Sequence, residues 1–88
     1  MACRVPEPEA LELILQGVDR IVQVSDEEVS AAMCMMFECT HNVCEGAGAA
    51  ALAAAVQEKT RLSGLRVAVI ASGGNVDQGV FARVLRND

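Results

Sequence analysis

The fold is decided by one stretch of the chain, residues 66–75, which reads RVAVIASGGN. Residues 66–71 predict a strand, because Arg66 is followed by the continuous apolar run 67–71, as in strands of parallel sheets that are covered on both faces. Ser72 to Asn75 then predict a sharp turn, because glycine and asparagine tolerate the backbone conformations of tight turns. Asp77 is placed to cap a final helix that extends to about Leu85. Residues 66–85 therefore predict a strand, a turn and a helix.

An alanine-rich segment at residues 45–56 lies upstream of this strand and predicts a helix. Its small side chains allow other backbones to approach closely. Polar residues return only at 57–61, the expected solvated last turn, and Gly64 breaks the chain before the strand. Residues 47–56 are apolar all round, and such helices are buried on every side. Because a chain of 88 residues can hardly enclose this helix, we expect covalently attached protein to cover it.

The first 24 residues predict a helix followed by a short strand. The helix over residues 7–17 begins at two prolines, where a missing N–H group costs least. Gly17 is placed to end this helix in the left-handed conformation. The compact β-branched run at residues 20–24 then predicts a strand.

A capping box at residues 25–28 predicts the start of a helix over residues 26–39. Ser25 can accept a hydrogen bond from a first-turn N–H group, while Glu28 reaches back to the N–H group of the serine. The face of this helix that points to the core carries side chains at helical spacing: Val29, Met33, Met36, Phe37 and Thr40. The predicted order is α, β, α, α, β, α, an α/β pattern without internal repeats or linkers.

The composition argues against several classes of partner. The chain is 52% hydrophobic and 22% charged, carries a net charge of −5 and contains neither Trp nor Tyr. Nucleic acids and membrane surfaces are bound through basic and aromatic side chains, so neither partner is expected. The N-terminus lacks the apolar run of a signal peptide, and residues 47–56 are far shorter than the roughly 20 residues that span a bilayer. Four cysteines in such a chain indicate reduced thiols, so we expect a cytoplasmic protein.

The loop at residues 72–75 is the expected ligand site, because open α/β sheets bind ligands at the carboxyl ends of their strands. Ser72 presents a hydroxyl there, and Gly73 and Gly74 allow a ligand to approach the backbone. A purely structural interpretation is also open, and the spacing alone favours it. In that interpretation the loop is a tight turn in which Ser72 and Asn75 satisfy backbone groups.

Several separated motifs together resemble the end of the threonine dehydratase catalytic domain. Residues 40–50 read THNVCEGAGAA, and residues 67–77 read VAVIASGGNVD. Residues 1–4, MACR, and residues 24–29, VSDEEV, are similar to two further motifs of that family. The resemblance covers nearly the whole chain, and the motifs occur in order.

The resemblance implies a fold-type II pyridoxal-phosphate enzyme, with residues 1–88 as the C-terminal fragment of its three-layer α/β catalytic domain. The complete enzyme would eliminate water from L-threonine or L-serine to give a 2-oxo acid and ammonia, as in isoleucine biosynthesis. Its cofactor would be pyridoxal 5'-phosphate, its assembly a homo-oligomer, and the partner of this chain the remainder of the catalytic domain. Asp88 lies where catalytic domains of the family without a regulatory extension end. The choice between threonine and serine stays open.

The resemblance also implies three cofactor-binding residues. In the family, the serine of the Ser-Gly-Gly-Asn loop hydrogen-bonds the pyridine nitrogen, which carries over to Ser72, and Gly73 lets the loop lie against the ring edge. A neutral hydroxyl does little to hold a proton on the ring nitrogen, so the ring becomes a milder electron sink that suits β-elimination. Glu45 matches a glutamate near the cofactor, although a first-turn acid that favours the helix dipole is an equally good interpretation.

The chain departs from the family because the catalytic lysine, the phosphate-binding glycine loop and the divalent-cation site belong to upstream sequence. The single lysine, Lys59, stands in a polar run, whereas a Schiff-base lysine needs an enclosed site. We therefore expect no catalytic residue here, and a chain that is inactive alone and binds no cofactor covalently. An in-frame continuation upstream of the Met1 codon, encoding the lysine and glycine motifs, would establish this interpretation.

Two other classes of function stay open. A small non-catalytic α/β module could bind a partner protein through the alanine-rich helix, and it would fold cooperatively by itself. A thiol-based metal or redox module would use the cluster Cys34, Cys39, His41 and Cys44. The cysteine spacing is not that of a zinc ribbon, so no metal site is expected.

Overall fold

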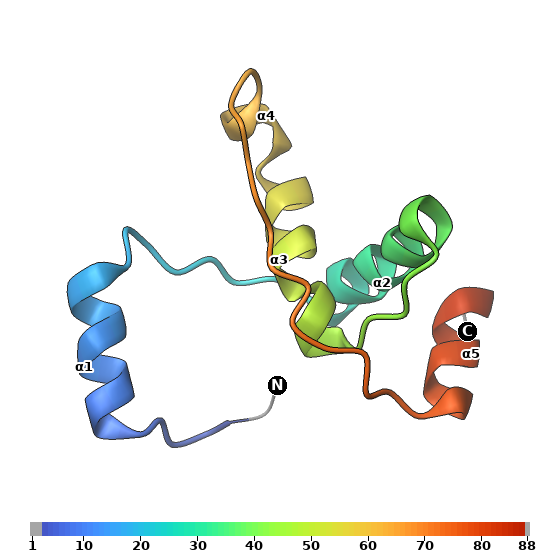
Figure 1. The fold of residues 1–88 in the computed structure, drawn as a ribbon, viewed down its shortest axis with the longest axis horizontal. Helices are drawn as coiled ribbons and strands as arrows, with labels where there is room; N and C mark the ends of the chain where they lie inside the picture. Colours follow the sequence, from blue (N-terminus) through green and yellow to red (C-terminus); the bar gives the residue numbers. More distant parts are fainter. Residues whose placement is uncertain (1–2, 88) are drawn as a thin grey trace.

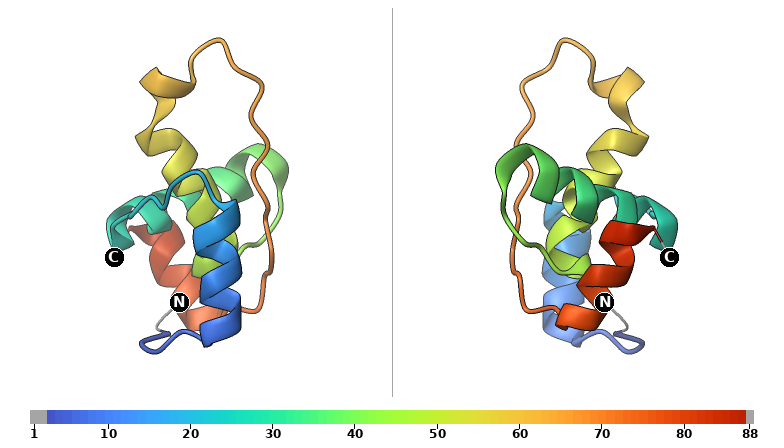
Figure 2. Two further views of the ribbon diagram at one scale, coloured as in Figure 1. Left: turned by 90° about the vertical axis from the view of Figure 1, so that its left-hand side faces the viewer. Right: turned by 90° about the vertical axis from the view of Figure 1, so that its right-hand side faces the viewer.

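The computed structural model describes residues 3–87 of the chain, so Met1, Ala2 and Asp88, which belong to the expectations above, lie outside it. Within this range the chain forms helices only, and it contains no β-strand (Figure 1). The helices are α1 (Pro8–Gly17), α2 (Asp26–Thr40), α3 (Gly46–Gln57), α4 (Lys59–Leu62) and α5 (Gln78–Arg86). Helices α2, α3 and α5 gather into one body, and α1 stands beside it (Figures 1 and 2).

Helix α2 begins at the predicted capping box. The Ser25 hydroxyl accepts from the Glu28 N–H group at 3.1 Å, and the Glu28 carboxylate accepts from the Ser25 N–H group at 3.2 Å. The helix ends at His41, which adopts the left-handed conformation with φ 59° and donates its N–H group to the Phe37 carbonyl. The predicted helix over residues 26–39 is confirmed and continues for one residue more.

The core lies where α2 packs against α3. Its buried members are Val29, Ala32, Met33, Cys44, Ala49 and Ala53. The residues that α3 contributes are alanines, so the two helix backbones approach closely and the core holds few large side chains. Helix α5 packs on another side of α2, where the rings of Phe37 and Phe81 meet edge to face with their centroids 5.7 Å apart.

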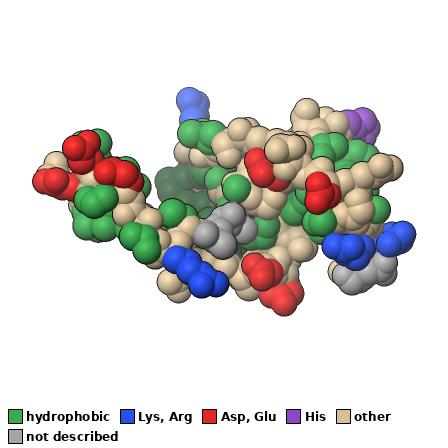
Figure 3. All heavy atoms as spheres, turned by 90° about the horizontal axis from the view of Figure 1, so that it is seen from below, with side chains coloured by type: hydrophobic (Ala, Val, Ile, Leu, Met, Phe, Trp, Pro, Cys, Tyr) green, Lys and Arg blue, Asp and Glu red, His purple; other side chains and the backbone are tan. Residues whose placement is uncertain are grey.

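The predicted helix over residues 7–17 is confirmed as α1, but its predicted ending is wrong. Gly17 does not adopt a left-handed conformation, since Gly64 is the one glycine with positive φ among residues 3–87. The chain instead leaves the helix at Val18, in extended conformation with φ −95°. No other helix within residues 3–87 packs against α1, and its residues Leu13 and Leu15 are more than 60% exposed. Figure 3 shows apolar and acidic side chains together on the arm that projects from the body.

The two predicted strands are absent, so the predicted order of α and β elements is not confirmed. Residues 20–24 and 66–71 run as irregular chain. A strand exists only through a hydrogen-bonded ladder with a neighbour, and no hydrogen bond from backbone to backbone joins either segment to another part of residues 3–87. The expected cover on both faces of residues 66–71 is also missing, because Ile70 is 78% exposed and Val67 is 50% exposed.

The described helices do not enclose their own apolar residues. Helix α3, expected to be buried on every side, is buried only at Gly48, Ala49 and Ala53. The accessible surface is 6911 Å², against about 5,000 Å² for a compact chain of this mass. The radius of gyration is 14.1 Å, against about 12 Å for a compact domain. Apolar surface that a folded domain would bury is therefore open here.

Two smaller expectations need correction. The polar residues 57–61 do not simply prolong α3, because the helix stops at Gln57 and a separate short helix, α4, begins at Lys59. Asp77 occupies the N-cap position of α5 with an extended backbone, but its side chain makes no capping hydrogen bond. Gly64 does break the chain as predicted, with φ 79°. No helix in the described range 3–87 is long and apolar enough to cross a membrane.

Replacing Ser25 with alanine should destabilise the start of α2 by about 1 kcal/mol, the usual cost of losing an N-cap hydroxyl. The Glu28 N–H group would then lack its acceptor. Amide hydrogen exchange over residues 28–33 should become faster. Ser63→Ala is the matched control, because Ser63 lies outside α2 and its hydroxyl caps no helix. Equal exchange rates in the two variants would contradict the capping role.

The Glu28 carboxylate should make α2 sensitive to acid. Hydrogen bonds from the Ser25 backbone and from the Gln57 side chain hold the pKa of Glu28 below its ordinary value. Because the pKa is lowered in the folded state, the stabilisation is complete above the ordinary carboxyl pKa and is lost as the pH falls through the lowered value. Glu28→Gln should make the helical circular dichroism signal less dependent on pH in the acid range. Glu27→Gln, one residue away, should keep the pH dependence of the parent chain.

Candidate functional site

The turn at residues 72–75 packs against the N-terminus of α3. The Glu45 N–H group donates to the Gly73 carbonyl at 3.0 Å. A Cβ atom on Gly73 would lie 2.5 Å from Oε1 of Glu45, so the carboxylate lies against the turn. The fold thus brings together Glu45 and Gly73, two of the three predicted cofactor-binding residues, although 28 positions separate them in the sequence.

The turn reaches α3 through glycines on both sides of the contact. A Cβ atom on Gly48 would lie 2.3 Å from the Gly73 carbonyl oxygen, and one on Gly74 would lie 2.5 Å from the Val43 carbonyl oxygen. Both distances are far below van der Waals contact, so larger residues would displace backbone. The Gly74 carbonyl also accepts from the Val76 N–H group at 3.0 Å, which tightens the turn. Gly73 and Gly74 therefore serve a close approach between two parts of this protein.

Ser72, the third predicted residue, is exposed at the start of this turn. Its hydroxyl makes no hydrogen bond to any part of the chain from residue 3 to residue 87, and neither does the Asn75 side chain. The structural interpretation required both side chains to satisfy backbone groups, and the structure does not show this. The Ser72 hydroxyl, which can donate or accept, is therefore open to solvent in the described chain.

Glu45 occupies the N-cap position of α3 with an extended backbone. Its side chain makes no capping hydrogen bond, although the position still places a negative charge at the positive end of the helix dipole. The position thus agrees with the interpretation of Glu45 as an acid that favours the helix dipole, and the carboxylate also lies beside the Ser72 turn. A role for Glu45 beside the cofactor stays a prediction.

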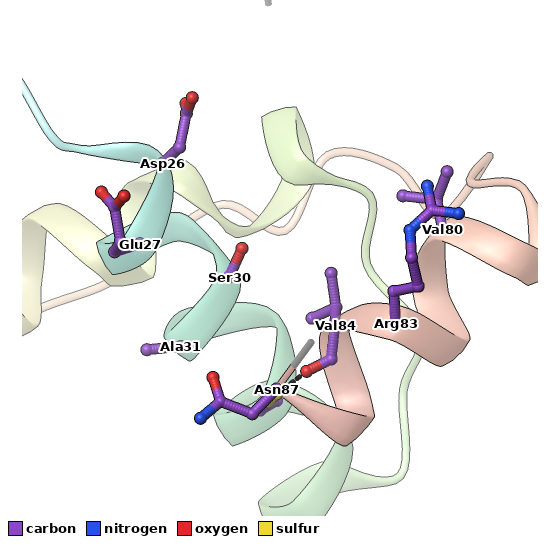
Figure 4. Close-up of a pocket in the computed structure, with 9 residues that line it drawn as sticks. Asp26, Glu27, Ser30, Ala31, Val80, Arg83, Val84 and Asn87 are labelled. Atoms are coloured by element: carbon purple, nitrogen blue, oxygen red, sulfur yellow. Dashed lines mark hydrogen bonds between the residues drawn. The ribbon is translucent and has the colours of Figure 1, made fainter.

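A groove lies elsewhere, between α2 and α5 (Figure 4). It has a volume of about 400 Å³ and contains neither Ser72, Gly73 nor Glu45. Figure 4 shows the acids of the first turn of α2 on one wall and Arg83 with Val84 of α5 on the other. Cys34 lies in this groove, where its thiol donates to the Val84 carbonyl at 3.3 Å. The groove is separate from the predicted cofactor site.

Lys59 and the cysteines have ordinary structural surroundings. Lys59 is exposed in α4, without the enclosure that Schiff-base chemistry requires. Cys44 is buried in the core, Cys34 is half-buried, and Cys3 and Cys39 are exposed. Within residues 3–87, no three His, Cys, Asp or Glu side chains gather in a way that could hold a metal ion.

A set of polar contacts that the sequence did not predict ties residues 20–23 to the end of α3, and we call it the clamp. Arg20 forms a two-pronged ion pair with Glu58, and the Gln57 amide donates to the Gln23 carbonyl at 2.9 Å. The hydrogen bonds of this pair lower the pKa of Glu58 and raise that of Arg20. Contacts across 34 to 38 positions leave no periodic signal, so the sequence could not have disclosed them.

Comparison with known proteins identifies the family of this chain. The family described as "Pyridoxal-phosphate dependent enzyme" matches residues 1–73, most of the chain. The chain belongs to the pyridoxal-phosphate-dependent enzyme family. The predicted resemblance is thereby confirmed at the level of the family, and so is the cofactor class that the family uses. No solved structure matches the chain significantly.

The chain is also similar to three named proteins. It is 36% identical over 85 residues to the L-threonine ammonia-lyase of Thermotoga maritima, covering 97% of this chain and 21% of that protein. It is 44% identical over 80 residues to the phenylserine dehydratase of Ralstonia pickettii, covering 90% and 24%. It is 40% identical over 78 residues to the L-threonine ammonia-lyase of Geobacter sulfurreducens, covering 88% and 19%. The chain thus spans about a fifth to a quarter of the length of these relatives.

Proposed function

We propose that this chain is the C-terminal segment of a pyridoxal-phosphate-dependent dehydratase acting on L-threonine or L-serine. The complete enzyme would eliminate water from the substrate and then release ammonia to give a 2-oxo acid. The observation that carries the proposal is the Ser72 turn. It presents an exposed hydroxyl without a partner in the described chain, on a backbone fixed against the N-terminus of α3.

In this proposal Ser72 hydrogen-bonds the pyridine nitrogen of the cofactor, and Gly73 brings the turn close to the ring edge. When bound, the cofactor supplies an electron sink for the bond-breaking steps. The protein sets the strength of this sink through the group beside the ring nitrogen. A neutral hydroxyl holds a proton there far less firmly than a carboxylate would, which favours elimination over long-lived carbanion chemistry. Glu45 stays beside the turn and supports its position.

The remainder of the catalytic domain is the proposed partner of this chain. The single lysine, Lys59, is exposed in α4 and therefore lacks the enclosed surroundings that covalent cofactor binding needs. The chain also leaves apolar residues open along residues 65–70 and on α1, where Leu65, Ile70 and Leu13 are each more than 60% exposed. Protein that carries the lysine would cover these side chains and supply their missing strand neighbours. The chain alone is therefore proposed to be inactive.

A chimera tests this proposal. The segment of the Thermotoga maritima L-threonine ammonia-lyase that matches this chain would be replaced by the chain itself, and 2-oxo acid formation from L-threonine would be followed. We expect measurable turnover that falls about tenfold in Ser72→Ala, since a hydrogen bond to the cofactor is worth about 1.4 kcal/mol. Ser63→Ala should retain the activity. A chimera that folds and binds the cofactor but does not turn over, or a Ser72→Ala chimera as active as its parent, would overturn the proposal.

A non-catalytic module that binds a partner protein is the second candidate, because α3 leaves part of its alanine-rich surface open, at Ala47 and Ala51. The two functions differ in how the isolated chain behaves. The dehydratase segment should bind a dye that fluoresces on apolar surface and should melt without a sharp transition. A cooperative melting curve without dye binding would favour the module. Fluorescence and calorimetry on the purified chain decide between them.

A further inference from the structure

Gly48 stands in α3 at a position where alanine would suit the helix better. Its neighbours Ala47, Ala49 and Ala50 are all alanine, and glycine inside a helix costs about 1 kcal/mol relative to alanine. The structure supplies a reason for the glycine. Its Cα faces the Gly73 backbone, and an added Cβ would lie 2.3 Å from the Gly73 carbonyl oxygen and 3.0 Å from the Gly73 nitrogen.

The same carbonyl is the acceptor that fixes the turn to α3. The Glu45 N–H group reaches it at 3.0 Å, so a side chain at position 48 would push on the atom that this hydrogen bond holds. Ordinary contact begins at 3.4 Å, so an alanine would displace the Gly73 carbonyl by about 1 Å. The displacement falls on the turn, because the Cβ at position 48 belongs to a packed helix, whereas the chain before the turn is irregular and exposed.

Ser72 is joined to Gly73 by one peptide bond and shares any displacement of it. Its side chain has no hydrogen bond of its own within residues 3–87 that would hold it in place. The position of its hydroxyl therefore follows the position of the turn. Displacements of about 1 Å in groups that align a reaction can reduce rates about 100-fold.

We propose that Gly48 is a positioning residue for Ser72. The missing side chain at position 48 lets the Gly73 carbonyl lie against the N-terminus of α3, and we call this contact the seat. The seat sets where the Ser72 hydroxyl meets the cofactor. The inference rests on the proposed function for its consequence in catalysis. The seat itself is independent of any cofactor and can be measured without one.

The first experiment measures the seat by amide hydrogen exchange in the chimera without cofactor, with Gly48→Ala and Gly79→Ala compared. Gly79 is the matched control, because it also lies in a helix and an added Cβ there meets nothing within 4 Å. Exchange at the Glu45 amide should accelerate at least tenfold in Gly48→Ala and stay unchanged in Gly79→Ala. A Glu45 amide that is unprotected in the parent chimera, or equally protected in both variants, would overturn the proposal.

Exchange at Met33, in the core of α2, shows whether the helix pair itself survives the substitution. If Met33 also loses protection in Gly48→Ala, Gly74→Ala replaces it as the test variant. A Cβ at Gly74 meets the Val43 carbonyl oxygen at 2.5 Å, so this variant displaces the same turn from the opposite side without touching α3. It should release the Glu45 amide and leave Met33 protected. Retained protection at Glu45 in that variant would count against the seat.

The second experiment asks whether Gly48 acts through Ser72, using the chimera. The dissociation constant of pyridoxal 5'-phosphate and the absorption maximum of the bound cofactor would be measured for Gly48→Ala, Ser72→Ala and the double variant. If Gly48 works by placing Ser72, the double variant should bind no more weakly than Ser72→Ala and share its spectrum. Additive losses would show that Gly48 has only a structural role. If Ser72→Ala itself changes nothing, the proposed function fails, whereas the exchange result stands by itself.

Discussion

The hydrogen bond from the Glu45 N–H group to the Gly73 carbonyl is the contact on which the candidate site depends. It joins two turns that the chain otherwise holds apart by the whole of α3, α4 and the irregular segment after them. Around this bond, three glycines remove the side chains that would keep the two backbones apart. Without it, Ser72 would be one more exposed serine on a loop. With it, the backbone that carries Ser72 is held against the N-terminus of α3.

Local signals in the sequence gave predictions that are confirmed in part, and signals that needed distant partners failed. The capping box at Ser25 and the break of the chain at Gly64 appear as predicted. Gly17 does not take the predicted left-handed conformation, and Asp77 makes no capping hydrogen bond. The apolar run at residues 66–71 predicts a strand only if another strand lies beside it, and the described chain provides none. The same limit applies to α3, whose all-round apolar surface predicts burial that these 88 residues cannot supply.

For the site, the motif residues were recognisable from sequence, but the way they meet was not. Glu45 and Gly73 were chosen separately, by resemblance, and the structure shows that they touch. Gly48 and Val43 were not singled out, although a glycine within an alanine run was a usable signal. The Arg20–Glu58 pair had no such signal, because it spans 38 positions and depends on where α3 ends. The sequence thus proposed the residues of the candidate site, and only the fold showed which contacts hold them in place.

The ion pair between Arg20 and Glu58 also marks the boundary between α1 and the helices that pack together. It ties residue 20 to the end of α3, whereas α1 precedes it and packs against no helix within residues 3–87. At ten residues, α1 is shorter than the roughly 12–15 residues at which isolated helices persist in water. Leu13 and Leu15 do not stabilise it through packing, since both are largely exposed. The N-terminal helix should therefore be the first to unfold on warming.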